Sequence, residues 1–169
     1  RLIPDLQLLA MDIRTCPPGG GGMPWHPDID FHSGKSIVSI NTALYLDDLT
    51  PDNGALRVLP RSHLLPFDLP EAERTSDLPG EVLVEIPAGT MVVFQDTLWH
   101  RTGDNLTDRP RRGLFTYYGH FWMKQTGYAA NPEPLHEMAR YIDGKGPERA
   151  RLMGRWSDGS EFNRHPATA

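Results

Sequence analysis

Short runs of apolar and β-branched residues alternate with clusters of Pro, Gly, Asn and Asp along most of the chain. Several short strands separated by turn residues are typical of an all-β sandwich or barrel. We therefore expect strands near residues 6–14, 36–46, 55–59, 81–86, 90–95 and 111–121. No internal repeat and no second domain boundary interrupts this pattern.

The second of these segments shows the clearest alternation. One set of alternate positions is apolar, whereas the other is mixed; the sets are Val38, Ile40, Thr42 and Leu44 against Ser39, Asn41 and Ala43. Alternate residues of a strand point to opposite faces of the sheet. The mixed face could therefore line a pocket.

Turn-forming residues mark the ends of several strands. The segments 51–54 (Pro-Asp-Asn-Gly) and 87–89 (Pro-Ala-Gly) combine residues that favour chain reversal with a Gly that tolerates positive φ. The segment 17–22 (Pro-Pro-Gly-Gly-Gly-Gly) cannot form a regular ladder and is expected to be a mobile loop beside the candidate site. A phosphate-binding loop is disfavoured there, because the Lys and the helix that should follow are missing. Residues 131–141 have the spacing of a short amphipathic helix outside the sheets.

Length, charge and cysteine content narrow the class of protein. At 169 residues the chain suits one domain with one core. The formal charge of −5 argues against general nucleic-acid binding. Cys16 is the only cysteine, so an internal disulfide and Cys-rich metal sites are excluded, and a reducing, cytoplasmic location is expected. No apolar run is long enough for a membrane helix and no signal peptide is visible, although the chain begins at Arg1, so a removed segment remains compatible with the sequence.

Two distant segments carry residues that bind metals. Trp25-His26-Pro27-Asp28 lies near the start of the chain, and Trp99-His100 lies far downstream. If a strand carries the first segment, His26 and Asp28 share one face and His100 completes a set of three ligands from a second strand. Two imidazoles and one carboxylate leave coordination positions open, which suits non-haem Fe(II) that binds cosubstrate and oxygen. An enzyme that activates oxygen is therefore the leading hypothesis.

The order of the motifs makes a family resemblance specific. Trp-His-x-Asp at residues 25–28 is followed by an Asp-Asn-Gly-Ala-Leu segment ending in Pro-x-Ser-His at residues 52–63. His-x-Thr-Gly-x-Asn at 100–105 and Arg-Pro-Arg-Arg at 109–112 then follow. In this order the chain resembles the phytanoyl-CoA dioxygenase-like family of Fe(II)- and 2-oxoglutarate-dependent oxygenases, over about residues 6–118. The resemblance implies a mainly β fold, a double-stranded β-helix (cupin-like jelly roll) with a few flanking helices, as a single oxygenase domain over residues 1–169.

The resemblance also implies roles for individual residues. His26, Asp28 and His100 match the iron ligands, and Arg111 matches the arginine that grips the distal carboxylate of 2-oxoglutarate. A guanidinium group pairs bidentately with a carboxylate and stays charged at any working pH. Thr102 matches a hydroxyl that donates to the same carboxylate. Strand alternation alone allows either Arg111 or its neighbour Arg112 to face inward, and the family spacing favours Arg111.

The remaining histidines are assigned structural or surface roles. His63 has a family counterpart that is not a metal ligand, so we expect it to anchor a turn by hydrogen bonds. Arg61 stands where the family usually has Gly, which leaves the geometry of that turn open. The histidines without a partner at ligand spacing are His32, His120, His136 and His165.

The implied reaction consumes 2-oxoglutarate and O2, releases succinate and CO2, and hydroxylates a C–H bond of a small natural-product or lipid-like molecule. Asp28 favours hydroxylation, because related halogenases have Ala or Gly in its place. No nucleic-acid or membrane partner is expected, and the oligomeric state and the substrate's identity do not follow from the sequence. Aromatic and acidic residues expected near the substrate are Trp25, Asp30, Phe31, Trp99, Tyr117 and Trp122.

Two other classes of function stay open at this stage. One is a cupin-like metal enzyme without 2-oxoglutarate, an isomerase or a direct oxygenase, against which Arg111 and Thr102 argue. The other is a jelly-roll binding module without catalysis. The chain is also shorter than typical family members, so an N-terminal helical layer and lid loops that shape substrate choice are expected to be missing or short.

Overall fold

The computed structural model describes residue 3, residues 6–29, 35–66 and 68–123, and residue 152. The chain divides into two compact units, one formed by residues 13–115 and the other by residues 1–12 together with 116–169. Because the expected helix at residues 131–141 lies outside the described residues, it remains a prediction, as does the single domain over residues 1–169. None of the described helices has the length and apolar character needed to span a membrane.

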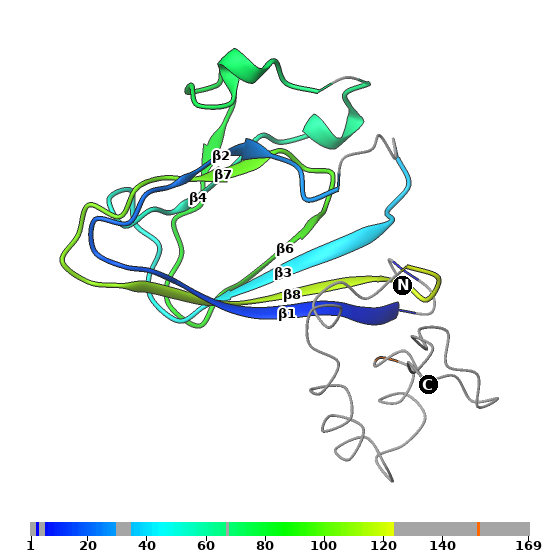
Figure 1. Cartoon of the computed structure of the whole chain (residues 1–169), viewed down its shortest axis with the longest axis horizontal. Coiled ribbons are helices and arrows are strands. Elements are labelled where there is room, and N and C mark those ends of the chain that lie inside the picture. The colour runs from blue at the N-terminus through cyan, green and yellow to red at the C-terminus, as the bar shows by residue number, and fades with distance from the viewer. Residues whose placement is uncertain (1–2, 4–5, 30–34, 67, 124–151, 153–169) are drawn as a thin grey trace, which may run out of the picture. The chain divides into compact units, whose positions relative to one another are not determined.

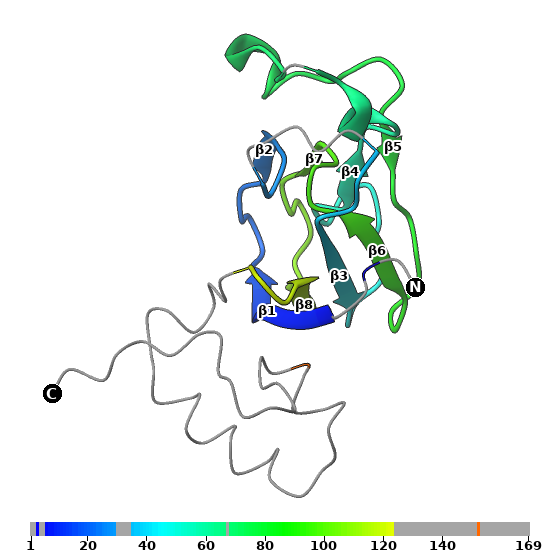
Figure 2. The same cartoon turned by 90° about the vertical axis from the view of Figure 1, so that its right-hand side faces the viewer.

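The described elements are nearly all strands, so the mainly β prediction is confirmed. Two four-stranded sheets have the orders β1-β8-β3-β6 and β2-β7-β4-β5. In the unit of residues 13–115 their strands form two layers (Figures 1 and 2). The strand bounds are β1 Leu6–Cys16, β2 Met23–His26, β3 Ser39–Tyr45, β4 Leu56–Val58, β5 Val82–Leu83, β6 Met91–Gln95, β7 His100–Thr102 and β8 Arg111–His120. The short 3-10 helices η1 (Ser62–Leu64) and η2 (Glu71–Glu73) lie between β4 and β5 in the sequence.

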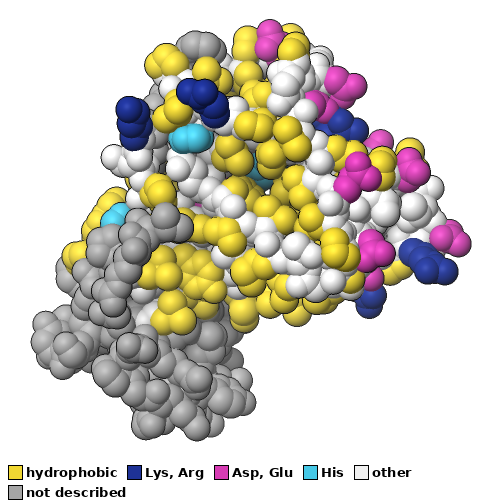
Figure 3. All heavy atoms as spheres, turned by 180° about the vertical axis from the view of Figure 1, so that it is seen from behind, with side chains coloured by type: hydrophobic (Ala, Val, Ile, Leu, Met, Phe, Trp, Pro, Cys, Tyr) yellow, Lys and Arg dark blue, Asp and Glu magenta, His cyan; other side chains and the backbone are white. Residues whose placement is uncertain are grey.

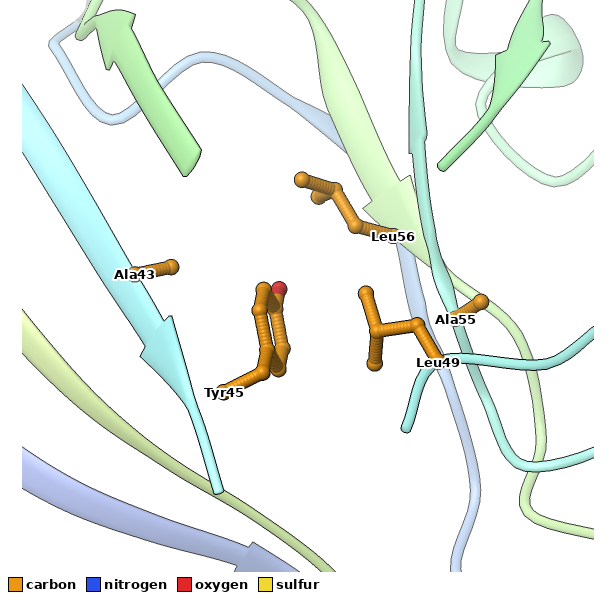
Figure 4. Close-up of a cluster of buried hydrophobic side chains, with 5 residues drawn as sticks. All are labelled: Ala43, Tyr45, Leu49, Ala55 and Leu56. Atoms are coloured by element: carbon orange, nitrogen blue, oxygen red, sulfur yellow. The ribbon is translucent and has the colours of Figure 1, made fainter. Parts of the chain in front are cut away.

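The core of the larger unit lies between the two layers. Ala43 and Tyr45 of β3 pack against Leu49, Ala55 and Leu56, and all five side chains are almost completely buried (Figure 4). Tyr45 also meets the ring of Phe115 edge-on, with the ring centroids 5.9 Å apart. Burial of these side chains supplies much of the hydrophobic stabilisation of this unit.

The mixed face of β3 is the interior face. Ser39, Asn41, Ala43 and Tyr45 are all buried. On the other face Ile40 is buried too, whereas Thr42 and Leu44 are only partly buried. Cross-strand pairing places Leu44 opposite Met91 and Thr42 opposite Val93, so the exposed Met91 and Val93 of β6 lie on that outer face. Figure 3 shows that hydrophobic side chains reach the surface over a broad area of one face of the molecule. A polar residue such as Asn41 inside the unit requires a polar partner.

Two sequence expectations about strands need correction. The strand expected at residues 81–86 is shorter in the structure, where only β5 is a regular strand. Beyond it, Val84 N donates to Leu56 O, and Ile86 forms an isolated bridge with Leu49. The short strands β2 and β7 were not expected as separate elements, although strand character had been assumed around their histidines.

The Gly-rich segment, for which a mobile loop was expected, makes several hydrogen bonds to the residues that follow β7. Gly19 N donates to Asn105 O, and Asn105 N donates to Gly20 O. Gly22 N donates to the Asp104 carboxylate, and a Cβ at Gly22 would lie 2.2 Å from Thr102 O. Glycine is therefore required for the chain to pass this close to β7. The contacts lie at the end of β2 opposite to His26.

The smaller unit has its own packing. Ile3, Leu8, Leu9 and Ala10 are buried. The amide nitrogen of Gln7, which is also buried, donates to the backbone oxygens of His120, Phe121 and Met123 at 2.6–3.0 Å. The two N–H groups of this one amide are therefore shared among three carbonyl oxygens where β8 ends.

Candidate metal centre

The larger unit brings His26, Asp28 and His100 together. Each offers one ligand atom, and these atoms all lie within 4.8 Å of one another. His26 is the last residue of β2 and lies directly opposite His100, the first residue of β7, in the antiparallel pair. The two imidazole rings are 4.4 Å apart between centroids. Strand pairing thus supplies two of the three side chains.

Asp28 reaches the cluster by a route that the sequence did not indicate. β2 ends at His26, so Asp28 is not on the same strand but in the bend that follows. Its backbone N donates to Asp96 O at 2.8 Å. Its side-chain Oδ2 accepts a hydrogen bond from the amide nitrogen of Asn41 and lies 3.5 Å from His100 Nε2. Contacts from β3 and from the turn after β6 therefore place this carboxylate.

The hydrogen bonds of both histidines leave the same nitrogen free. His26 Nδ1 lies 2.7 Å from Pro24 O, and His100 Nδ1 lies 2.9 Å from Leu98 O. A carbonyl oxygen only accepts hydrogen bonds, so in each ring Nδ1 carries a hydrogen, and Nε2 is the nitrogen left to bind a metal. Metal-bound histidines are commonly oriented by such a bond from the other ring nitrogen. The two rings are thus prepared to bind a metal through Nε2.

Burial keeps His100 in the form that binds metals. Loss of solvent lowers the pKa of His100 below its ordinary value, and this outweighs the opposing effect of the Asp28 charge. The edge of the Phe94 ring packs against His100 with the ring centroids 4.9 Å apart. His100 is accordingly a neutral imidazole beside a carboxylate at neutral pH. Two imidazoles and one carboxylate form a donor set that suits a divalent transition metal.

A second buried carboxyl group lies close to the cluster. Asp96 is 4% exposed, and its burial, together with the nearby Asp28 charge, raises its pKa to about 7. Neither Asp96 nor Asn41 was singled out from the sequence. The mixed face of β3 was the only signal for Asn41, and Asp96 carried none.

Of the three arginines considered from the sequence, Arg111 is the buried one. It is 8% exposed, its Nε has no hydrogen-bond partner among the described residues, and its guanidinium carbon lies 5.9 Å from the centre of the Tyr45 ring. Arg112 points outward and pairs with Asp47 through two nitrogens at 2.7 and 3.0 Å. Arg109 is exposed. A buried guanidinium with an unsatisfied nitrogen is prepared to bind an anion.

Thr102 lies two residues beyond His100 on β7. Its Oγ1 accepts a hydrogen bond from Met23 N at 3.0 Å, which leaves the hydroxyl proton available for donation.

The residues expected near the substrate lie in different environments. Trp25 is fully buried, packs with Trp99 and Leu69, and donates its indole N–H to Ser76 O, so in this structure it is a core residue. Trp122 is 58% exposed and stacks on His120 in the smaller unit, to which Tyr117 also belongs. Asp30 and Phe31 lie outside the described residues, as do His32, His136 and His165.

A small polar pocket is lined by neighbours of the cluster in the sequence, among them Pro27 and Ile29 on either side of Asp28. The other lining residues are Ser62, His63, Asp68, Thr97 and Trp99. His63 Nδ1 is buried without a hydrogen-bond partner in the described part of the chain, so a turn-anchoring bond at this atom is not found. Arg61 just before it adopts a left-handed conformation, with φ 69°, which explains why Gly suits this position.

The sequence matches one protein family and several known proteins. The family model described as phytanoyl-CoA dioxygenase (PhyH) matches residues 7–113. L-proline trans-4-hydroxylase of Streptomyces griseoviridis is 27% identical over 130 residues, which cover 59% of this chain and 48% of the relative. The chain spans less than half the length of the curated relatives that it matches, from 36% to 48%.

Solved structures share the fold. AviO1 from Streptomyces viridochromogenes Tue57 is 31% identical with a TM-score of 0.59, over 68% of this chain and 51% of that one. EctD from S. alaskensis, solved with 2-oxoglutarate and 5-hydroxyectoine, is 25% identical with a TM-score of 0.56, over 69% of this chain and 45% of that one. The jelly-roll prediction is thereby confirmed.

Proposed function

Because the chain belongs to the phytanoyl-CoA dioxygenase (PhyH) family, we propose that it carries the metal centre of an Fe(II)- and 2-oxoglutarate-dependent oxygenase. The observation that supports this most directly is the cluster of His26, Asp28 and His100, whose ligand atoms lie within 4.8 Å of one another. Two imidazoles and one carboxylate occupy one side of an iron ion and leave positions for the cosubstrate and oxygen.

Arg111 is the residue that binds the distal carboxylate of 2-oxoglutarate. Its burial makes an unpaired positive charge costly, and a carboxylate that pairs with it offsets this cost. The ring of Tyr45 holds the guanidinium from one side, and the Thr102 hydroxyl serves as a second donor to the same carboxylate. A buried arginine at this place favours the 2-oxoglutarate enzyme over a cupin-like enzyme that does not use this cosubstrate.

With iron, 2-oxoglutarate and O2 bound, the centre supplies an oxidation in which the keto acid loses CO2 to become succinate while the substrate is oxidised. The protein contributes position and exclusion of water. His26 and His100 are held by their Nδ1 hydrogen bonds, Asp28 by Asn41 and Asp96, and the Phe94 ring packs against His100. Such preorganisation lets the ligands bind without losing side-chain freedom at that moment.

We infer hydroxylation of a C–H bond in a small natural-product or lipid-like molecule as the outcome. Asp28 occupies a coordination position that a halide would otherwise need. The names of two similar proteins, L-proline trans-4-hydroxylase and EctD with 5-hydroxyectoine, also support a hydroxylated small molecule.

The test is aerobic formation of succinate from 2-oxoglutarate by the purified protein with added Fe(II). His26→Ala and His100→Ala should lower the rate at least about 100-fold, since each removes a ligand. His120→Ala is the matched control, because this histidine contributes no atom to the cluster and should leave the rate within about twofold. Unchanged succinate formation in both ligand variants would refute the proposal.

A further inference from the structure

Asn41 makes a contact with the metal cluster that the sequence motifs did not indicate. Its side chain is 4% exposed on the interior face of β3, and its amide nitrogen donates to Asp28 Oδ2. We propose that Asn41 is a positioning residue that fixes the Asp28 carboxylate for metal binding. This inference rests on the proposed function, since it needs a metal at the cluster.

The chemistry of the two side chains fixes the orientation of the amide. An ionised carboxylate only accepts hydrogen bonds, so the Nδ2 end of Asn41 must face Asp28. The opposite end, Oδ1, is buried and has no hydrogen-bond partner among the described residues. Burial of an unsatisfied acceptor is unfavourable, so a charge-assisted bond at the other end has to offset that cost.

The oxygen that Asn41 contacts is the one that faces the cluster. Asp28 Oδ2 lies 3.5 Å from His100 Nε2, the nitrogen left free for a metal. A carboxylate oxygen has two lone-pair directions, and the amide uses one of them. The other stays available, while rotation of the carboxylate about its Cβ–Cγ bond is restrained.

This restraint matters because Asp28 itself lies outside regular structure. β2 ends at His26, and the backbone at Asp28 is held through its N–H bond to Asp96 O. That bond places the backbone but leaves the side-chain rotamer free. Of the described contacts to the carboxylate, only that of Asn41 is a hydrogen bond from a residue outside the ligand set. Asn41 also adds no charge, so it does not compete with Asp28 for the metal.

The experiment is a titration of the metal-free protein with Co(II) under anaerobic conditions, read from the visible absorption of the bound ion. Asn41→Ala removes the donor, and Asn41→Leu removes it while keeping the number and branching of the side-chain heavy atoms. We expect Co(II) to bind about 10–100-fold more weakly to both, as is typical when a partner of a metal ligand is lost. At saturating Co(II), their absorption spectra should also differ from that of the wild type, because the Asp28 ligand is no longer fixed.

Ser39→Ala is the matched control. Ser39 is buried on the same face of β3, and its side chain interacts with Asp96 rather than with any residue of the cluster. The Ser39→Ala protein should bind Co(II) with an affinity within about threefold of that of the wild type and give the same absorption spectrum. The melting temperature of each metal-free variant separates loss of folding from loss of binding, and Asn41→Leu provides a folded variant if Asn41→Ala does not fold.

The outcomes distinguish this inference from the proposed function. If wild-type protein binds Co(II) and a folded Asn41→Leu binds it equally well with an unchanged spectrum, the role of Asn41 is wrong and the metal centre stands. If the wild type itself binds no Co(II), both fail.

Discussion

Arg111 and Arg112 are adjacent on β8 but point to opposite faces of the sheet, one buried beside Tyr45 and the other paired with Asp47 at the surface. The alternation of a strand thus gives two neighbouring arginines entirely different environments.

This difference predicts opposite effects of two similar substitutions. Arg111→Lys should raise the KM for 2-oxoglutarate about 10-fold or more, because an ammonium group lacks the bidentate geometry of guanidinium. Arg112→Lys is the matched control and should change that KM less than about twofold. Exposed ion pairs contribute little, so Arg112→Lys should also leave the midpoint of urea denaturation nearly unchanged. Equal effects of the two substitutions on KM would contradict the assignment of Arg111.

The turn before His63 carries a removable strain. Arg61 adopts φ 69°, a conformation that costs an L-residue roughly 1–2 kcal/mol. Arg61→Gly should therefore stabilise the protein by up to about 1 kcal/mol, after the greater unfolded-state entropy of glycine is subtracted. Urea denaturation measures this change. Arg61→Ala, which keeps the Cβ and the strain, should show no comparable gain, and a destabilised Arg61→Gly would contradict the argument.

Asn105 should be essential for stability. It is fully buried, and its amide nitrogen donates to Cys16 O, Pro17 O and Arg109 O at 2.7–3.2 Å. Asn105→Ala leaves these carbonyl groups without their donor and should lower the free energy of unfolding by roughly 2–4 kcal/mol.

The same variant tests where this network lies relative to the metal cluster. The network holds the Gly-rich segment at the end of β2 opposite to His26. Co(II) affinity of the folded Asn105→Ala protein should therefore stay within about threefold of the wild type. A large loss of Co(II) affinity without loss of stability would show that the segment belongs to the site.

The pH dependence of stability should contain a contribution from Asp96. Its pKa in the folded, metal-free protein is about 7, against an ordinary value of 3.8. Between these values the folded state holds a proton that the unfolded state has released, so stability falls as the pH rises. We expect this group to cost about 2 kcal/mol between pH 5 and pH 8.

Asp96→Asn removes that titration. Its free energy of unfolding, measured in urea at both pH values, should fall by about 2 kcal/mol less than that of the wild type. All other ionisable side chains are the same in the two proteins, so their contributions cancel in the comparison. An identical pH slope for the two proteins would contradict the raised pKa.

The sequence predicted the long strands well because their apolar runs and their turn residues agree. β3 and β6 begin and end within three residues of the expected bounds, and Gly54 and Gly89 have the positive φ that their turns require. The strands β2 and β7 have only four and three residues, too few for alternation to be recognised. Their existence depends on pairing with distant segments rather than on local pattern.

For the site, too, the sequence predicts the residues that belong to local motifs but not the contacts that form only when the chain folds. The three residues of the cluster could be named from motifs, whereas the contacts that place Asp28 could not. They come from Asn41 on β3 and from Asp96 after β6, two positions joined to Asp28 only by the folded chain. Burial of Arg111 rather than Arg112 likewise follows from which face of β8 meets the core, which alternation alone leaves undecided.

The most direct test of the account is a crystal structure of the protein grown without oxygen in the presence of Mn(II) and 2-oxoglutarate. We predict an anomalous peak about 2 Å from His26 Nε2, His100 Nε2 and an oxygen of Asp28. The distal carboxylate of 2-oxoglutarate should lie about 3 Å from the Arg111 guanidinium. A metal bound by other residues would contradict the proposed metal centre, and a 2-oxoglutarate carboxylate held away from Arg111 would contradict the proposed role of this arginine.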